Sequence, residues 1–199
     1  MSRERPILFN GAMVRAILSG TKTQTRRAIK GIPWRPGCNP GFSQARAFSN
    51  AGEFRIAGSQ EMTTGFRCPF GQPGDRLWVR ETWCHAWDDE RDQWSAPERY
   101  HYRADGIEVV HVDDGERSPW CPSIHMPRRA CRLLLEITDV RVERLQAISE
   151  ADARAEGVDP EMPDECVLAF ERLWVSIGGP SSWNNNPWVW VIEFKVVTP

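Results

Sequence analysis

The sequence predicts an α+β fold: a mostly antiparallel β-barrel with two or three packed helices, in a single domain of 199 residues. Three observations predict it. Apolar, strand-like segments stand near both ends and in the second half of the chain, at 6–9, 131–145 and 188–197. Short helix patterns with capping signals lie between them. Two further stretches, at about 31–74 and 104–122, are interpreted as long insertions.

The N-terminal part is expected to form one strand and one helix. Pro6–Phe9 is the strand. Asn10 can cap a helix over 12–18, and Gly20 follows it at the position where a left-handed backbone is common.

The segment after this helix, 21–27, carries three threonines, one lysine and two arginines. Threonine favours strands, and alternation places Thr23, Thr25 and Arg27 on one face. Hydroxyl and cationic groups on both faces of a strand are unusual for packing alone. The segment is therefore expected to form the wall of a site.

Glycine and proline are dense across 31–74, which predicts a long loop with a small hairpin near 53–56. An ordered loop of this length usually acts as a lid or a binding element, and disorder is the competing interpretation. After it, a strand over 76–83 alternates so that Glu81 points inward. An inward carboxylate needs a cationic partner, for which Arg27 or Lys22 is expected.

The remaining strands are predicted at 99–103, 131–145 and 188–197, and the second of these is expected to bend near 138–139. Asp113-Asp114-Gly115 marks a turn between the first two.

Two helices are expected between the last two strands. Ser149 begins the first with a capping-box pattern, and this helix runs to Glu156 and stops at Gly157. The second begins near 163–164 and ends at 178–180, with an apolar stripe formed by Val167, Phe170, Trp174 and Ile177.

Composition narrows the functional classes. The net charge of −2 gives no global attraction to nucleic acid, so any polyanion must be bound by a local patch. No apolar run is long enough to span a bilayer and the N-terminus does not resemble a signal peptide, so no membrane contact and a cytoplasmic location are expected.

The six cysteines contain no C-x-x-C pair, and we expect free thiols and no metal or other cofactor. A zinc site is the alternative. Its ligands would come from Cys68, Cys84, His85, Cys121 and His125.

Lys22, Thr25 and Glu156 form the first candidate site. A threonine hydroxyl becomes a nucleophile when a base takes its proton, and a lysine can be that base when burial or neighbouring cations lower its pKa. Regular strand geometry puts Lys22 and Thr25 on opposite faces, so Lys22 must lie in the turn after Gly20 or a bulge must intervene. At the end of a helix the dipole disfavours an ionised Glu156, which suits a general acid. A solvated rim and an ordinary surface glutamate are the competing interpretation.

A second candidate lies at 123–129, where His125 precedes Arg128 and Arg129. These side chains suit a phosphate or carboxylate, and a solvent-facing basic turn is the alternative.

Three motifs carry a resemblance to a known family: Gly-Thr-Lys-Thr-Gln-Thr-Arg-Arg at 20–27, Pro-Gly-Asp-Arg-Leu-Trp-Val at 73–79 and Trp-Val-Ile-Glu-Phe at 190–194. The chain resembles the ASCH-domain family, whose fold is a PUA-like β-barrel. With Trp-Val-Arg-Glu-Thr-Trp at 78–83 and His-Met-Pro-Arg at 125–128, it is similar to the larger members found in bacteriophages and prophages.

The resemblance implies an activity. Enzymatic members are amidohydrolases that remove the acetyl group of N4-acetylcytidine, with a lysine proton acceptor, a threonine nucleophile three residues later and a glutamate proton donor. Lys22, Thr25 and Glu156 correspond to these, and Arg27 to an arginine that steadies the substrate or the oxyanion. The implied partner is a modified cytidine, as a nucleoside, a nucleotide or part of a nucleic acid. Glu81, His125 and Arg128 are further candidates for substrate binding.

Two alternatives stay open. The chain would be a PUA-like module that binds RNA or single-stranded DNA through Lys22, Arg26, Arg27, Arg128 and Arg129, with tryptophans stacking on bases. It would otherwise be a phage assembly or host-interaction protein without chemistry. The oligomeric state does not follow from the sequence.

Overall fold

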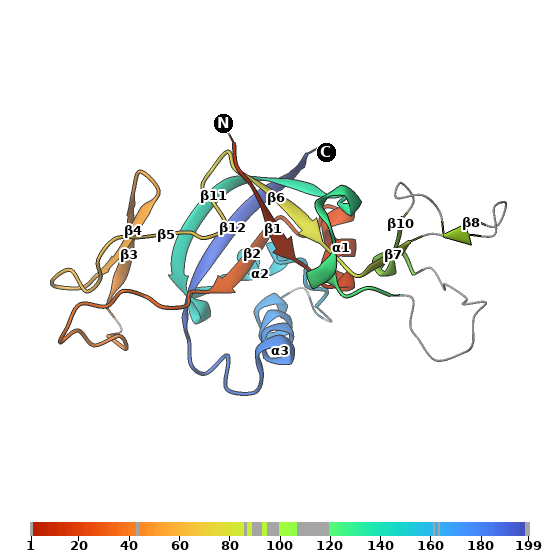
Figure 1. Cartoon of the computed structure of the whole chain (residues 1–199). Helices are drawn as coiled ribbons and strands as arrows, with labels where there is room; N and C mark the ends of the chain where they lie inside the picture. Colours follow the sequence, from red (N-terminus) through yellow and green to blue (C-terminus); the bar gives the residue numbers. More distant parts are fainter. Residues whose placement is uncertain are drawn as a thin grey trace.

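A computed structural model describes residues 2–42, 44–85, 87–88, 93–94, 100–106, 120–160, 162 and 164–197. It confirms the α+β class. The central element is a five-stranded sheet with the order β1-β6-β11-β12-β2 (Figure 1). Its strands are β1 (Glu4–Leu8), β2 (Gln24–Ala28), β6 (Arg76–Arg80), β11 (Leu134–Arg144) and β12 (Trp188–Val197).

The sheet is mixed and strongly curved (Figure 1). β1 pairs with β6 in parallel, and the other three pairings are antiparallel. β1 and β2 are the two edge strands, and no strand ladder joins them in the part of the chain that the structure describes. Closure into a barrel is therefore not shown, and the barrel stays a prediction.

The two long strands agree with the sequence. β12 has the predicted bounds, and the β11–β12 register shifts between Ile137 and Asp139, where the bend was expected. Alternation along β12 divides the core: Trp190 and Ile192 pack inside the curve of the sheet, whereas Val189 and Val191 pack on the opposite face beneath the helices.

The helices also follow their local signals. In α1 (Gly11–Leu18) the side chain of Asn10 accepts a hydrogen bond from Met13 N, and Gly20 follows with φ +77°. In α2 (Glu150–Ala155) Ser149 forms the capping box with Asp152. α3 (Cys166–Gly178) covers α2 and the sheet and buries Phe170 in the same cluster as Val189 and Val191.

Part of the 31–74 insertion forms a second sheet of β3 (Arg46–Asn50), β4 (Glu53–Ala57) and β5 (Phe66–Arg67), which includes the predicted hairpin. It is anchored by aromatic contacts. The ring centroids of Phe54 and Phe66 lie 5.0 and 5.5 Å from that of Trp190 on β12. This insertion therefore stands beside the central sheet as a fixed wall.

Four predicted strands have different bounds. The strand predicted at 131–145 covers Leu134–Arg144, and the strand predicted at 99–103 covers Tyr100–Tyr102. The first strand begins at Glu4 instead of Pro6. The segment 76–83 divides, because β6 ends at Arg80 and β7 (Trp83–His85) leaves the main sheet to pair with β10 (Tyr100–Tyr102). A further pair is β8 (Trp87–Asp88) and β9 (Gln93–Trp94).

Short 3-10 helices lie at Arg103–Asp105, Ser123–His125, Arg128–Ala130 and Leu145–Ala147. Most of the predicted 104–122 insertion, residues 107–119 with its expected turn, lies outside the described residues. Among the described residues, no helix is both long enough and apolar enough to cross a membrane.

Candidate functional site

Lys22 lies in the turn between α1 and β2, where the sequence required it to be if it serves Thr25. Its backbone N donates to Ala16 O at 3.0 Å, and it forms an isolated antiparallel bridge with Glu156, the residue that caps the C-terminus of α2. The next residue continues the contact, because Thr23 N donates to Ala155 O at 2.9 Å. The end of α2 is thereby tied to the segment that enters β2.

Gly157 allows this close approach. Its φ is +74°, and a Cβ at this position would lie 2.7 Å from Lys22 Cβ and 2.9 Å from Ala16 Cβ. A side chain here would be strained by its backbone and would also push the two segments apart. The glycine thus both ends α2 and leaves room for Lys22.

The Lys22 amine and the Glu156 carboxylate form a buried ion pair. Lys22 Nζ donates to Glu156 Oε2 at 2.8 Å and to Glu156 O at 2.7 Å, and the side chains are 0% and 3% exposed. Burial lowers the pKa of Lys22, and the charges of Arg27 and Arg26 lower it further, while Glu156 acts in the opposite direction. The net effect lowers the pKa of the Lys22 amine below its usual 10.5, so that its neutral form is easier to reach than that of an exposed lysine.

Arg26 holds the other oxygen of Glu156. Its Nη1 lies 3.4 Å from Glu156 Oε1, and its Nη2 lies 3.2 Å from Glu143 Oε2 and 3.5 Å from Asp152 Oδ2. Arg141 pairs with the same two acids at 2.7 and 2.8 Å. The sequence interpretation missed this network, although strand alternation places Arg26, Arg141 and Glu143 on one face of the sheet.

Thr25 lies on the opposite face of β2 from Arg26, paired with Ile192 and 2% exposed. It lines a pocket of about 1000 Å³ together with Arg26, Arg27 and Glu156, whereas Lys22 lies behind this lining. Within the described residues, no hydrogen-bond partner is assigned to the Thr25 hydroxyl. Thr25 is therefore a buried residue of the pocket lining whose hydroxyl has no assigned partner.

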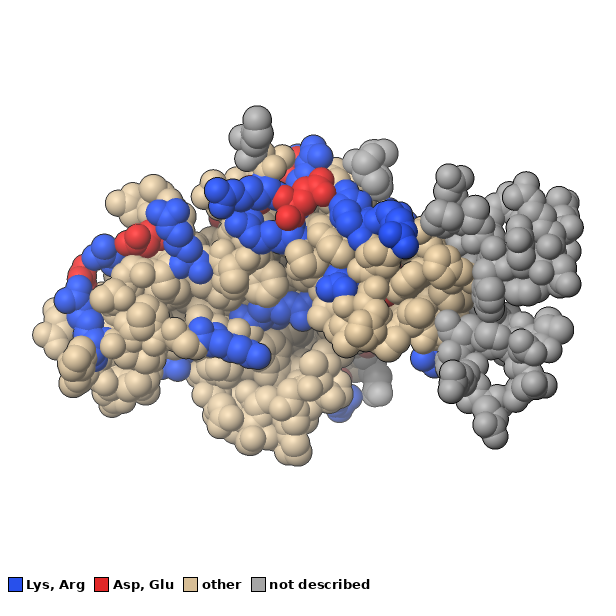
Figure 2. Space-filling view, viewed as in Figure 1, with Lys and Arg blue, Asp and Glu red and all other residues tan. Residues whose placement is uncertain are grey.

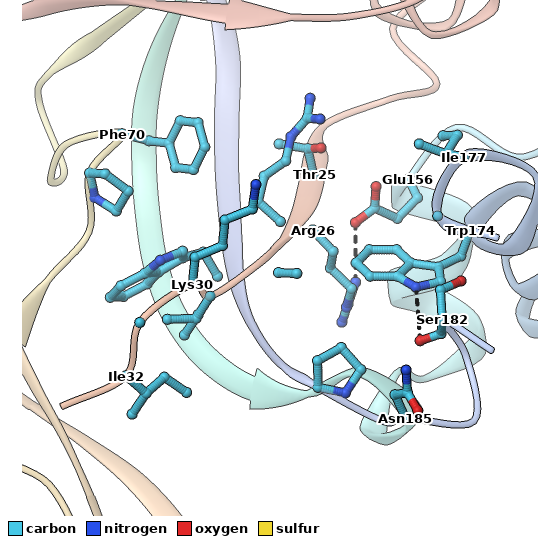
Figure 3. A pocket seen from close by; sticks show the side chains of 18 of the residues that line it. Thr25, Arg26, Lys30, Ile32, Phe70, Glu156, Trp174, Ile177, Ser182 and Asn185 are labelled. Atoms are coloured by element: carbon cyan, nitrogen blue, oxygen red, sulfur yellow. Dashed lines mark hydrogen bonds and ion pairs between the residues drawn. The ribbon is translucent and has the colours of Figure 1, made fainter. Parts of the chain in front are cut away.

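Two walls of different origin enclose the pocket (Figure 3). Trp174 and Ile177 come from α3, and the Trp174 indole is oriented by a hydrogen bond to Ser182 O at 3.3 Å. Opposite them, Ile32 and Phe70 come from the two ends of the 31–74 insertion, and Lys30 stands just before it. The sequence interpretation suggested a binding role for this insertion but did not identify these wall residues.

Arg27 spans the gap between the two edge strands. Its Nη2 donates to Leu8 O at 2.7 Å, and its guanidinium lies 5.1 Å from the Phe9 ring centroid. The buried Nε has no assigned partner. Burial lowers the pKa of Arg27, against the attraction of Glu156. Arg27 thus lines the pocket while one of its donors is buried without an assigned partner.

The other predicted site residues lie elsewhere. Glu81 is buried as expected, but its partner is Arg132, through two contacts of 2.9 Å, and neither Arg27 nor Lys22. Arg128 pairs with Glu4 at 3.0 Å on the surface, and His125 lies in a 3-10 helix. None of the three lines the pocket that contains Thr25.

The proposed zinc ligands do not assemble in the part of the chain that the structure describes, where no group of three or more His, Cys, Asp or Glu side chains is placed to hold a metal ion. Cys68, Cys84 and Cys121 are free thiols.

The sequence and the structure were compared with known proteins. No family model matches the chain, and no curated protein matches it. A solved structure that is similar is the crystal structure of protein EF3133 from Enterococcus faecalis V583, described as family DUF984. The match has 12% identity and a TM-score of 0.42, and covers all of this chain and 82% of that one.

Proposed function

We propose that this chain is an amidohydrolase of the ASCH type, with a PUA-like barrel, that removes an acyl group from the N4 amine of cytosine in a nucleoside, nucleotide or nucleic acid. One observation carries the proposal: the unpartnered hydroxyl of Thr25 shares a pocket wall with the carboxylate of a buried Lys22–Glu156 pair. A nucleophile, a base and an acid are the groups that acyl transfer needs.

The buried pair can supply base and acid together. When the proton on Lys22 Nζ passes to Glu156 Oε2 across their 2.8 Å contact, a neutral amine and a neutral acid result. Burial favours neutral groups, so this redistribution costs less here than it would in water.

The reaction then proceeds in two steps. Thr25 Oγ1 attacks the amide carbonyl carbon while Lys22 takes the hydroxyl proton, and Arg27 stabilises the oxyanion that forms. The C–N bond breaks as Glu156 protonates the leaving N4 nitrogen, which releases cytosine with a free amine and leaves an ester on Thr25. The proton that Lys22 took then passes to Glu156, which makes Lys22 neutral again. Water, deprotonated by Lys22, attacks the ester, and the carboxylic acid leaves as Thr25 regains its proton from Glu156.

A non-catalytic module that binds RNA or single-stranded DNA is the second candidate. The observation in its favour is that aromatic and cationic side chains share the pocket, among them Phe70, Trp174, Lys30 and Arg67. Stacking platforms beside cations are typical of single-strand binding. This candidate needs no proton transfer and therefore predicts no turnover.

The decisive experiment measures deacylation of N4-acetylcytidine, as the nucleoside, the 5′-monophosphate and within a short oligonucleotide. We expect turnover by the wild type and a loss of at least about 10³-fold in Thr25→Ala and in Lys22→Ala. Thr23→Ala is the matched control, because Thr23 is an exposed threonine two residues away. No turnover of any substrate, or full activity in both site variants, would overturn the proposal.

A further inference from the structure

The pocket is far more cationic than the chain as a whole. Arg26, Arg27, Lys30 and Arg67 line it, and among the described residues that line it Glu156 is the one acid. The chain nevertheless has a net charge of −2. On the face drawn in Figure 2, Lys and Arg gather around the hollow between the β3–β5 sheet and α3. Positive charge is therefore concentrated where a ligand would enter.

Not all of these cations are paired with acidic side chains of the protein. Arg26 is neutralised by Glu156, Glu143 and Asp152. Lys30 and Arg67 are exposed, and in the part of the chain that the structure describes neither forms an ion pair. Two exposed cations that line one pocket attract an anion.

Lys30 and Glu156 lie on opposite sides of the pocket (Figure 3). Lys30 follows β2 and extends into the pocket from the side of Ile32 and Phe70, whereas Glu156 lies near Trp174 and Ile177 of α3 (Figure 3). Arg67 ends β5, on the same insertion as Phe70. In the proposed reaction Glu156 protonates the leaving nitrogen of the base, so the base belongs near α3 and a charged extension of the substrate can reach the insertion.

We propose that Lys30 and Arg67 form a phosphate subsite, and that the substrate is a phosphorylated cytidine, either a nucleotide or a residue in a strand. The identity of the substrate rests on the proposed function, whereas the preference for phosphate rests on the pocket charge alone. The pocket size agrees with an extended ligand. At about 1000 Å³ it matches the upper end of the range of roughly 300–1,000 Å³ for small-molecule sites.

The test uses the full chain and ligands that cannot react. Calorimetry compares cytidine, cytidine 5′-monophosphate, inorganic phosphate and a short oligocytidine in wild type, Lys30→Ala, Arg67→Ala and the double variant. Lys195→Ala is the control, because Lys195 is an exposed lysine that pairs with Glu136 and does not line the pocket. We expect the monophosphate to bind about tenfold more tightly than cytidine at low salt, and the double variant to lose this preference while it keeps its affinity for cytidine.

Each outcome decides the proposal. Equal binding of cytidine and its monophosphate by the wild type, no binding of any ligand, or an equal loss of both ligands in the double variant would overturn it. A further gain with the oligonucleotide identifies a strand as the source of the phosphate, and no gain identifies a nucleotide. A phosphate preference without deacylation would leave the subsite intact and refute the amidohydrolase.

Discussion

Among the described residues two buried glutamates have cationic partners, and only one of them lines the pocket that contains Thr25. Glu81 is 1% exposed and Glu156 is 3% exposed. Both carboxylate oxygens of Glu81 accept hydrogen bonds from the guanidinium of Arg132. The same guanidinium pairs with Asp105 and lies 4.0 Å from the centroid of the Tyr102 ring. Glu156 divides its oxygens between Lys22 and Arg26.

The difference lies in the partner and in access. A guanidinium stays protonated at any ordinary pH, so the Glu81–Arg132 pair cannot exchange a proton. An amine with a lowered pKa can, and Glu156 also opens on the pocket beside Thr25. Burial of a carboxylate alone does not mark a reactive site. Glu156 differs from Glu81 in two ways: its partner Lys22 can lose a proton, and Glu156 lines the pocket.

The largest expected effect separates the two carboxylates by activity. Glu156→Gln should lower kcat for deacylation by about 10²–10⁴-fold, since it removes the proton donor. Glu81→Gln should leave the kcat of the folded fraction within about twofold of the wild type, because it does not line the pocket. Steady-state kinetics on protein of verified folding check both, and similar losses in the two variants would refute the distinction.

The Glu81–Arg132 pair should matter for the stability of the fold and not for activity. Arg132→Leu leaves Glu81 buried without its partner, and removal of one member of a buried pair costs about 3–5 kcal/mol. Urea unfolding measures this change in the free energy of unfolding. Arg128→Leu, which breaks the exposed pair with Glu4, is the control and should cost less than about 1 kcal/mol. Equal costs for the two arginines would show that the Glu81 pair carries no special weight.

Two glycines sharpen the role of the contact at the end of α2. Gly157→Ala should destabilise the fold by about 3 kcal/mol and displace Lys22, because it combines a positive φ with a Cβ 2.7 Å from Lys22 Cβ. Gly106→Ala has a similar φ of +72° with no atom within 4 Å, and should cost about 1 kcal/mol. Thermal unfolding and kinetics of both variants test this, and equal stabilities would contradict the close packing.

The smallest effect is a displacement along the pH axis. In the proposed reaction Lys22 and Glu156 share one proton. Activity should therefore fall as the pH rises above the pKa of Lys22, which burial holds below its usual 10.5, because the shared proton is then lost and Glu156 cannot protonate the leaving nitrogen. Arg26→Gln removes a positive charge beside the amine, so the pKa of Lys22 should rise and the activity limb should move to higher pH.

NMR can read this shift without catalysis. The lysines of the chain are Lys22, Lys30 and Lys195, so titration of protein with carbon-13 at lysine Cε gives well-separated signals, with the two exposed lysines as internal references. A Lys22 signal that titrates with the other two, or does not move in Arg26→Gln, would contradict the account.

Local sequence rules predicted much of the framework. The cap at Asn10, the capping box at Ser149 and the bounds of β12 depend on residues a few positions apart, and all three are confirmed. Lys22 and Thr25 are three positions apart, so the sequence alone places them in one segment. Strand alternation also predicted that Glu81 points inward, and Glu81 is buried.

Only the tertiary structure decided which groups meet. Lys22 and Glu156 are 134 positions apart, and strand alternation does not tell which arginine faces Glu81 or that Arg26 shares Glu156. The pocket likewise has walls from β2, the 31–74 insertion and α3, whose proximity follows from sheet order. Propensity and capping act within a few residues, and so the sequence determined the elements of this protein, whereas the ion pairs and the pocket arose from packing between them.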